Sequence, residues 1–168
     1  MELGQYIVKE KTAPDGYVLD TTEHAVTLDD SHTSVNVAVQ NQKNAIVLQK
    51  VSKNDGTVME GVTFHIWNDD KSYDKTQKTD SNGRITIDGV KDGTWHYQET
   101  ATKDGYVLDN AVKDFTVSDG KVNGQSNLTI TVENDYTKLD LAKVDSGTGE
   151  NISGAKLSLL DSNGRLVE

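Results

Sequence analysis

A lysine, a glutamate and an asparagine each lie in phase with an alternating run of apolar residues: Lys50, Glu99 and Asn134. Side chains alternate between the two faces of a β-strand, so each polar group shares a face with its apolar neighbours. Those neighbours are Ile46 and Leu48 for the lysine, Trp95 and Tyr97 for the glutamate, and Leu128, Ile130 and Val132 for the asparagine. We therefore expect an amine, a carboxyl group and a carboxamide to point into one interior.

Burial would make these three groups reactive toward one another. A charge on an apolar face is costly unless it is paired, so burial favours the neutral amine and the neutral acid. The neutral amine of Lys50 is a nucleophile, and the acid of Glu99 can hydrogen-bond to the carboxamide oxygen of Asn134 and carry protons. Fixed proximity adds a high effective molarity. The expected product is a Lys–Asn amide, formed once with loss of ammonia.

A plainer interpretation is a set of strand-end residues whose polar heads reach solvent, with a salt bridge between lysine and glutamate. The reactive interpretation is favoured because the set occurs a second time, as Lys143, Glu10 and Asn41. Each member again follows apolar residues on its own face. These are Leu139 and Leu141 for the lysine, Tyr6 and Val8 for the glutamate, and Val35, Val37 and Val39 for the asparagine.

The two sets belong to an internal repeat. The segment KEKTAPDGYVLD recurs as QETATKDGYVLD, LQKVSKNDGTVMEGVTFHI as LAKVDSGTGENISGAKLSL, and VNVAVQN as LTITVEN. Within one unit the order is lysine strand, glutamate strand, asparagine strand. The chain therefore divides into the C-terminal half of one module (1–44), a complete module (45–135) and the N-terminal part of a third (136–168).

The elements that must position these residues are strands. The apolar period is two throughout, and turn sequences stand at 54–56, 81–83, 91–93 and 104–105. This pattern is typical of an all-β sandwich. We expect Trp67 and Tyr73 to lie in the core.

Composition excludes several function classes. The formal net charge of −10 argues against nucleic acid and anionic membrane as partners. No apolar stretch is longer than 45–48, which argues against membrane insertion, and residues 1–10 carry no signal-peptide pattern. We therefore expect any export signal or wall anchor to be encoded outside these residues. The chain has no cysteine, so disulfides cannot stabilise its modules.

No motif predicts a cofactor, a metal or a turnover enzyme. The histidines lack zinc-site spacing, and we expect surface or strand positions for them: His24, His32, His65 and His96. The acidic pairs lack the spacing of a calcium-binding loop. Phosphate-binding, dinucleotide-binding and serine-hydrolase motifs are absent from the sequence. The only chemistry we expect is the single self-condensation.

The sequence resembles the collagen-adhesin B-type (Cna-B) domains of Gram-positive adhesins and pilins. Their Lys-Val-Asp strand is matched by 143–145, whereas 50–52 reads Lys-Val-Ser. Their Glu-Thr-x-Ala-Pro-x-Gly-Tyr segment is nearly intact at 10–17, and 99–106 has Lys103 in place of the proline. Their last strand ends in asparagine, as do both copies here. The likeness extends over nearly the whole chain.

This resemblance implies tandem immunoglobulin-like, prealbumin-like sandwich modules in a stalk on the cell surface or cell wall. It implies a Lys50–Asn134 crosslink catalysed by Glu99, and a Lys143–Asn41 crosslink catalysed by Glu10 in the split module. The alternative function is a ligand-binding adhesin module that recognises a host or matrix molecule, which the sequence does not identify.

The two incomplete modules, 1–44 and 136–168, cannot each bury a core alone. One carries the glutamate and asparagine strands and the other the lysine strand, while the linkers near 42–44 and 136–138 are short. We therefore expect Lys143 of one molecule to meet Glu10 and Asn41 of a neighbouring copy, head to tail, in an open chain that a covalent bond could close. The alternative is that packing against adjacent modules holds both halves.

Overall fold

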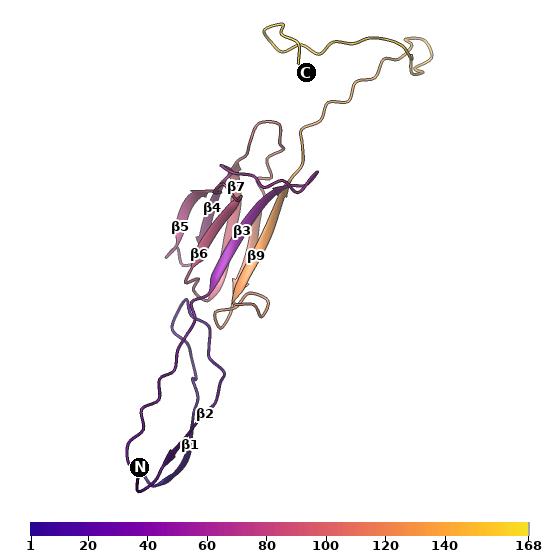
Figure 1. The fold of residues 1–168 in the computed structure, drawn as a ribbon. Coiled ribbons are helices and arrows are strands. Elements are labelled where there is room, and N and C mark those ends of the chain that lie inside the picture. The colour runs from indigo at the N-terminus through magenta and orange to yellow at the C-terminus, as the bar shows by residue number, and fades with distance from the viewer. Residues whose placement is uncertain (168) are drawn as a thin grey trace. The chain divides into compact units, whose positions relative to one another are not determined.

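The computed structural model describes residues 1–167, so Glu168, the last residue of the expected third segment, lies outside the described residues. Every regular element of the described chain is a β-strand, which confirms the predicted all-β class (Figure 1). No helix in this part of the chain is long and apolar enough to cross a membrane. The strands are β1 (Gly4–Val8), β2 (His24–Leu28), β3 (Ala45–Ser52), β4 (Thr63–Asn68), β5 (Asp74–Lys78), β6 (Arg84–Asp88), β7 (Gly93–Ala101), β8 (Val112–Val117) and β9 (Asn127–Asn134).

Seven of these strands form a sandwich of two sheets. One sheet has the order β6-β3-β9 and the other the order β5-β4-β7-β8. Strand β3 pairs antiparallel with β6 and parallel with β9, and Figure 1 shows β9 running beside β3. Because β3 opens the module and β9 closes it, their parallel pairing puts the entry and the exit of the chain at opposite ends of the sandwich.

The core lies between the sheets and follows the alternation of the sequence. In β3 every second residue is buried, beginning at Ile46, and β4 and β7 alternate in the same way. Trp95 and Phe115 stack within this core, and Tyr73 packs against it. The expectation of a core position is wrong for Trp67, which is partly exposed on the other face of β4, stacked between His65 and His96. It lies out of phase with the buried residues of its strand.

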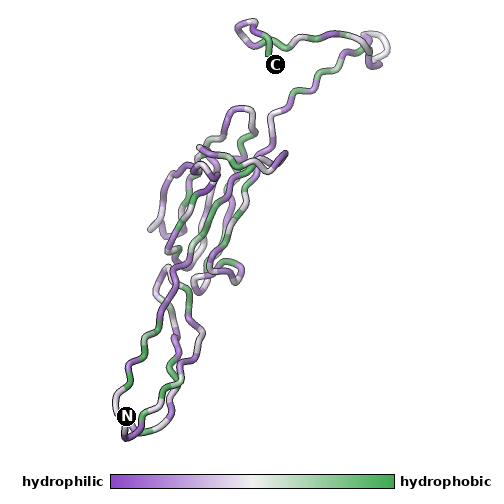
Figure 2. Tube along the Cα trace, in the orientation of Figure 1, coloured by the Kyte–Doolittle hydropathy of each residue, from purple (hydrophilic) through white to green (hydrophobic). Residues whose placement is uncertain are grey.

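The N-terminal half module contains a hairpin and two long loops. Strands β1 and β2 pair antiparallel, and Figure 2 shows apolar positions interspersed with polar ones along this part of the chain. The strand predicted to lead through 35–41 to Asn41 is not formed. In the complete module the corresponding strand, β9, owes its backbone pairing to the lysine strand β3, and the half module has no lysine strand of its own.

The half module meets the complete module at Asn44. The Asn44 side chain is buried, donates hydrogen bonds to the carbonyl oxygens of Val90 (2.7 Å) and Gly120 (3.2 Å), and accepts one from the Val90 amide (2.6 Å). The close approach of the two modules also requires a glycine at position 120, because a Cβ at Gly120 would lie 2.2 Å from the carbonyl oxygen of Tyr17. Residues Met1–Thr137 accordingly form one compact unit.

A second unit begins at Lys138. The strand predicted over 139–145 does not form, and Leu139, Leu141 and Lys143 are all exposed. Lys143 is exposed in the single chain, so its interior position, which was expected against a neighbouring copy, stays a prediction. An isolated strand leaves its backbone groups unpaired and its apolar face in water, so the pattern alone cannot stabilise it.

Candidate functional site

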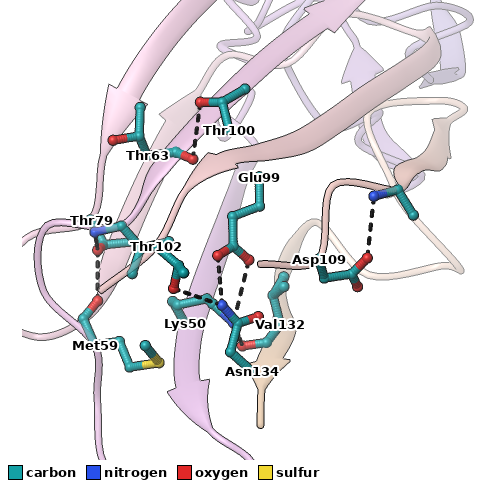
Figure 3. A network of polar contacts seen from close by, with 12 residues as sticks. Lys50, Met59, Thr63, Thr79, Glu99, Thr100, Thr102, Asp109, Val132 and Asn134 are labelled. Atoms are coloured by element: carbon teal, nitrogen blue, oxygen red, sulfur yellow. Dashed lines mark hydrogen bonds and ion pairs between the residues drawn. The ribbon is translucent and has the colours of Figure 1, made fainter. Parts of the chain in front are cut away.

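The structure brings Lys50, Glu99 and Asn134 together inside the complete module (Figure 3). They come from β3, β7 and β9, so both sheets contribute. Their exposed fractions are 0%, 2% and 2%, which places the three polar groups within the apolar interior. Each lies in the buried phase of its strand, and the pairing of β3 with β9 sets Lys50 opposite Val132, two residues before the asparagine.

Glu99 lies between the other two side chains. Its Oε2 is 3.6 Å from Lys50 Nζ, and its Oε1 accepts a hydrogen bond of 2.6 Å from Asn134 Nδ2. The lysine also donates a hydrogen bond of 3.3 Å to the carbonyl oxygen of Val132. One carboxyl group thus contacts both the amine and the carboxamide, as a proton carrier between them must.

Burial lowers the pKa of the Lys50 ammonium below its ordinary value of 10.5. The nearby Glu99 charge opposes this effect, but loss of hydration is the largest cause. The geometry therefore increases the share of neutral, nucleophilic amine at a given pH.

Two buried oxygens of the site have no hydrogen-bond partner among the described residues: Glu99 Oε2 and Asn134 Oδ1. A buried acceptor without a donor is costly. Glu99 faces the carboxamide nitrogen of Asn134, so the hydrogen bond expected from the acid to the carboxamide oxygen is not formed in this structure.

The second predicted set is only partly assembled. Asn41 Nδ2 donates to Glu10 Oε1 (2.7 Å), to Glu10 Oε2 (2.9 Å) and to the carbonyl oxygen of Val18 (3.2 Å), so the glutamate and asparagine are in contact here too. Asp20 N also donates to Glu10 Oε2, at 2.7 Å. Lys143 belongs to the unit that begins at Lys138, where its side chain is exposed.

One contact of the site was not predicted. Thr102 Oγ1, directly after the end of β7, accepts a hydrogen bond of 2.8 Å from Asn134 Nδ2. The only sequence signal was a difference between the repeats, because the position three residues after the glutamate is Thr102 in one copy and Ala13 in the other.

The SpaA prealbumin-like fold domain matches residues 1–43 and 44–134. The chain belongs to this family. Its relation to Gram-positive surface proteins, predicted from the sequence motifs, is thereby confirmed, as is the tandem prealbumin-like sandwich fold.

Solved structures similar to this SpaA-type chain come from Gram-positive bacteria. The Bacillus anthracis TIE protein is 27% identical over 99% of the chain, with a TM-score of 0.53. The Bacillus cereus major pilin subunit BcpA is 28% identical over 54% of the chain, with a TM-score of 0.45. The matched regions cover 32% and 28% of those proteins, so the chain spans about a third of their length or less. No curated protein sequence matches it significantly.

Proposed function

We propose that the chain is a stalk segment of a Gram-positive cell-surface adhesin or pilus protein, whose complete module locks itself with a Lys50–Asn134 isopeptide bond. The observation that carries this proposal is the buried contact of one carboxyl group with both an amine and a carboxamide. Membership of the SpaA family supports the stalk role and the surface location.

The reaction is a transamidation within one module. The neutral Lys50 Nζ attacks Cγ of Asn134, and a proton passes from the nitrogen to Glu99 and on to the departing Nδ2. The Nζ–Cγ bond forms, the Cγ–Nδ2 bond breaks, and ammonia leaves. Glu99 ends in its starting protonation state, so no other reactant is needed, and the event occurs once per module.

The position of this bond suits a load-bearing role. The chain enters the module at β3 and leaves after β9, at opposite ends of the sandwich. A Lys50–Asn134 bond would therefore join the first strand directly to the last, and tension would pass through it. The buried Asn44 contacts would continue the load-bearing structure toward the preceding half module.

The test is the intact mass of the purified chain under denaturing conditions. We expect the wild-type chain to weigh one ammonia less than its sequence formula, and Lys50→Ala, Glu99→Ala and Asn134→Ala each to restore the formula mass. The matched controls are exposed neighbours of the same residue types, Lys53→Ala, Glu133→Ala and Asn127→Ala, which should keep the lower mass. A wild-type chain at its formula mass would exclude the proposed bond.

We propose further that the half module accepts the lysine strand of another copy. Its side chains leave an apolar hollow lined by Tyr6, Val8, Val26, Leu28, Val35 and Val37. The matching apolar segment is exposed at Leu139 and Leu141. Transferring the β3–β9 register through the repeat pairs Leu139 with Val35, Leu141 with Val37 and Lys143 with Val39. Lys143 would then lie beside Glu10 and Asn41, which already contact each other.

Denaturing electrophoresis at increasing protein concentration tests this junction. We expect a ladder of covalent multimers from the wild-type chain, and monomer only from Lys143→Met or Asn41→Ala. Lys138→Met, outside the predicted lysine strand, should keep the ladder. Wild-type chains that stay monomeric would exclude the covalent head-to-tail junction. They would not affect the proposed Lys50–Asn134 bond, which the intact-mass measurement tests separately.

A further inference from the structure

The carboxamide of Asn134 is held by two acceptors rather than one. Its Nδ2 donates to Glu99 Oε1 at 2.6 Å and to Thr102 Oγ1 at 2.8 Å (Figure 3). Nδ2 has two hydrogens, so the glutamate and the threonine together satisfy both. This nitrogen is the atom that leaves as ammonia in the proposed reaction, which puts the threonine hydroxyl in contact with a reacting atom.

The half module provides a comparison within the same chain. There the residue corresponding to Thr102 is Ala13, and Asn41 Nδ2 contacts both oxygens of Glu10, at 2.7 and 2.9 Å, and the carbonyl oxygen of Val18 at 3.2 Å. Where both the hydroxyl and the lysine are missing, the carboxamide engages both carboxylate oxygens and a backbone carbonyl. In the complete module Thr102 takes one of the two hydrogens, and Glu99 Oε2 instead faces Lys50 Nζ at 3.6 Å.

We infer that Thr102 is a further catalytic residue of the Lys50–Asn134 condensation: it holds the leaving nitrogen and keeps Glu99 Oε2 available to the lysine. This inference rests on the proposed function and names an additional residue for it. A carboxyl group bonded through both oxygens to the carboxamide has fewer acceptor positions left for the proton of the attacking amine. Fixing the carboxamide with a separate hydroxyl removes that competition and sets the direction from which Nζ meets Cγ.

The role requires the hydroxyl group and little else of the side chain. Thr102 is partly exposed directly after the end of β7 and contributes no buried apolar surface to the core cluster. Thr102→Val keeps the branched shape and removes the oxygen, and Thr102→Ser keeps the oxygen. Thr100→Val is a matched control, since Thr100 is an exposed residue near the end of β7 whose hydroxyl contacts the Thr63 carbonyl at 3.3 Å.

The experiment follows the condensation of the full chain in time. The chain is made in a short cell-free synthesis, quenched in denaturant at intervals, and weighed for the loss of ammonia. We expect Thr102→Val to slow this loss roughly tenfold, the scale of one lost hydrogen bond to a reacting group. Thr102→Ser and Thr100→Val should condense at about the wild-type rate.

A second measurement separates chemistry from stability. Thr102→Val is placed in the Glu99→Gln chain, which cannot condense, and its thermal unfolding is compared with that of Glu99→Gln alone. Equal unfolding temperatures with a slowed condensation support the catalytic role, whereas a fall in stability large enough to explain the slowing overturns it. Equal rates for wild type and Thr102→Val overturn this inference alone. A wild-type chain that never loses ammonia overturns the proposed function itself.

Discussion

At the scale of single residues, the complete module places a lysine where a lysine is costly. Lys50 has an exposed fraction of 0%, and a buried ion pair with Glu99 recovers only part of the hydration that both groups lose. Condensation would convert the amine into a neutral amide and remove this cost permanently. The unfavourable placement of the amine in the folded module would thus favour the proposed reaction.

The lowered pKa of Lys50 predicts how the condensation rate depends on pH. Because burial depresses this pKa below 10.5, the neutral amine accumulates at lower pH than in a free lysine. We expect the rate of ammonia loss to rise with pH and to level off before pH 10.5. Timed intact-mass measurements on freshly synthesised chain would show the profile.

The lowered pKa of Lys50 also predicts how the stability of the folded module changes with pH, and this second pH effect serves as a control. A lysine whose pKa is lower in the folded state binds fewer protons there than in the unfolded state, so folding gains stability as the pH rises toward 10.5. The uncondensed Glu99→Gln chain, in which Gln cannot carry the proton, should show this gain in chemical denaturation. For the rate prediction, a rate of ammonia loss that keeps rising beyond pH 10.5 would contradict the conclusion that burial lowers the pKa of Lys50.

At the scale of elements, alternation was sufficient to predict the phase of Lys50 in β3, Glu99 in β7 and Asn134 in β9. Burial follows a period of two in any strand with one face on a core, so the sequence already shows which side chains point inward. The same pattern failed over 35–41 and 139–145, because a strand also requires a neighbour that pairs with its backbone. Thr102 could not be predicted, since it directly follows the end of β7, where strand periodicity no longer applies.

The outer face of the β4–β7 pair predicts a second pH effect. His96 Nε2 bonds to Asp69 Oδ1 at 2.7 Å and its Nδ1 to Asp114 Oδ1 at 2.6 Å, and these contacts raise the pKa of His96 above 6.5. A raised pKa adds stability that is fully present below pH 6.5 and is lost as the pH rises through the folded-state pKa. We expect His96→Gln to destabilise the module below pH 6.5 and to have a smaller effect at alkaline pH.

Chemical denaturation of both chains across this pH range measures the effect. The background should be Glu99→Gln, so that condensation does not mask the difference. His32→Gln is the control, because His32 is exposed and lies outside the sandwich. A destabilisation by His96→Gln that is the same at every pH would show that stacking on Trp67, and not the charge of His96, is what stabilises this face.

At the scale of the whole molecule, the parallel pairing of β3 with β9 decides how the chain responds to tension. A pull on the two ends of the module loads β3 from Ala45 and β9 from Asn134, and these strands lie side by side. Hydrogen bonds alone would resist this load until the sheet gives way. A covalent bond from Lys50 to Asn134 would carry the load instead, and the segment between the two residues would stay folded.

Single-molecule stretching of the full chain tests this load path. We expect the wild-type chain to show no unfolding step from the complete module, because the tension bypasses residues 51–133. Glu99→Gln should show one added step, with an extension of roughly 3.6 Å for every released residue. Glu133→Gln, an exposed change in β9, should behave as the wild type. A wild-type step as long as that of Glu99→Gln would show that the tension passes through the hydrogen-bonded sheet and not through a Lys50–Asn134 bond.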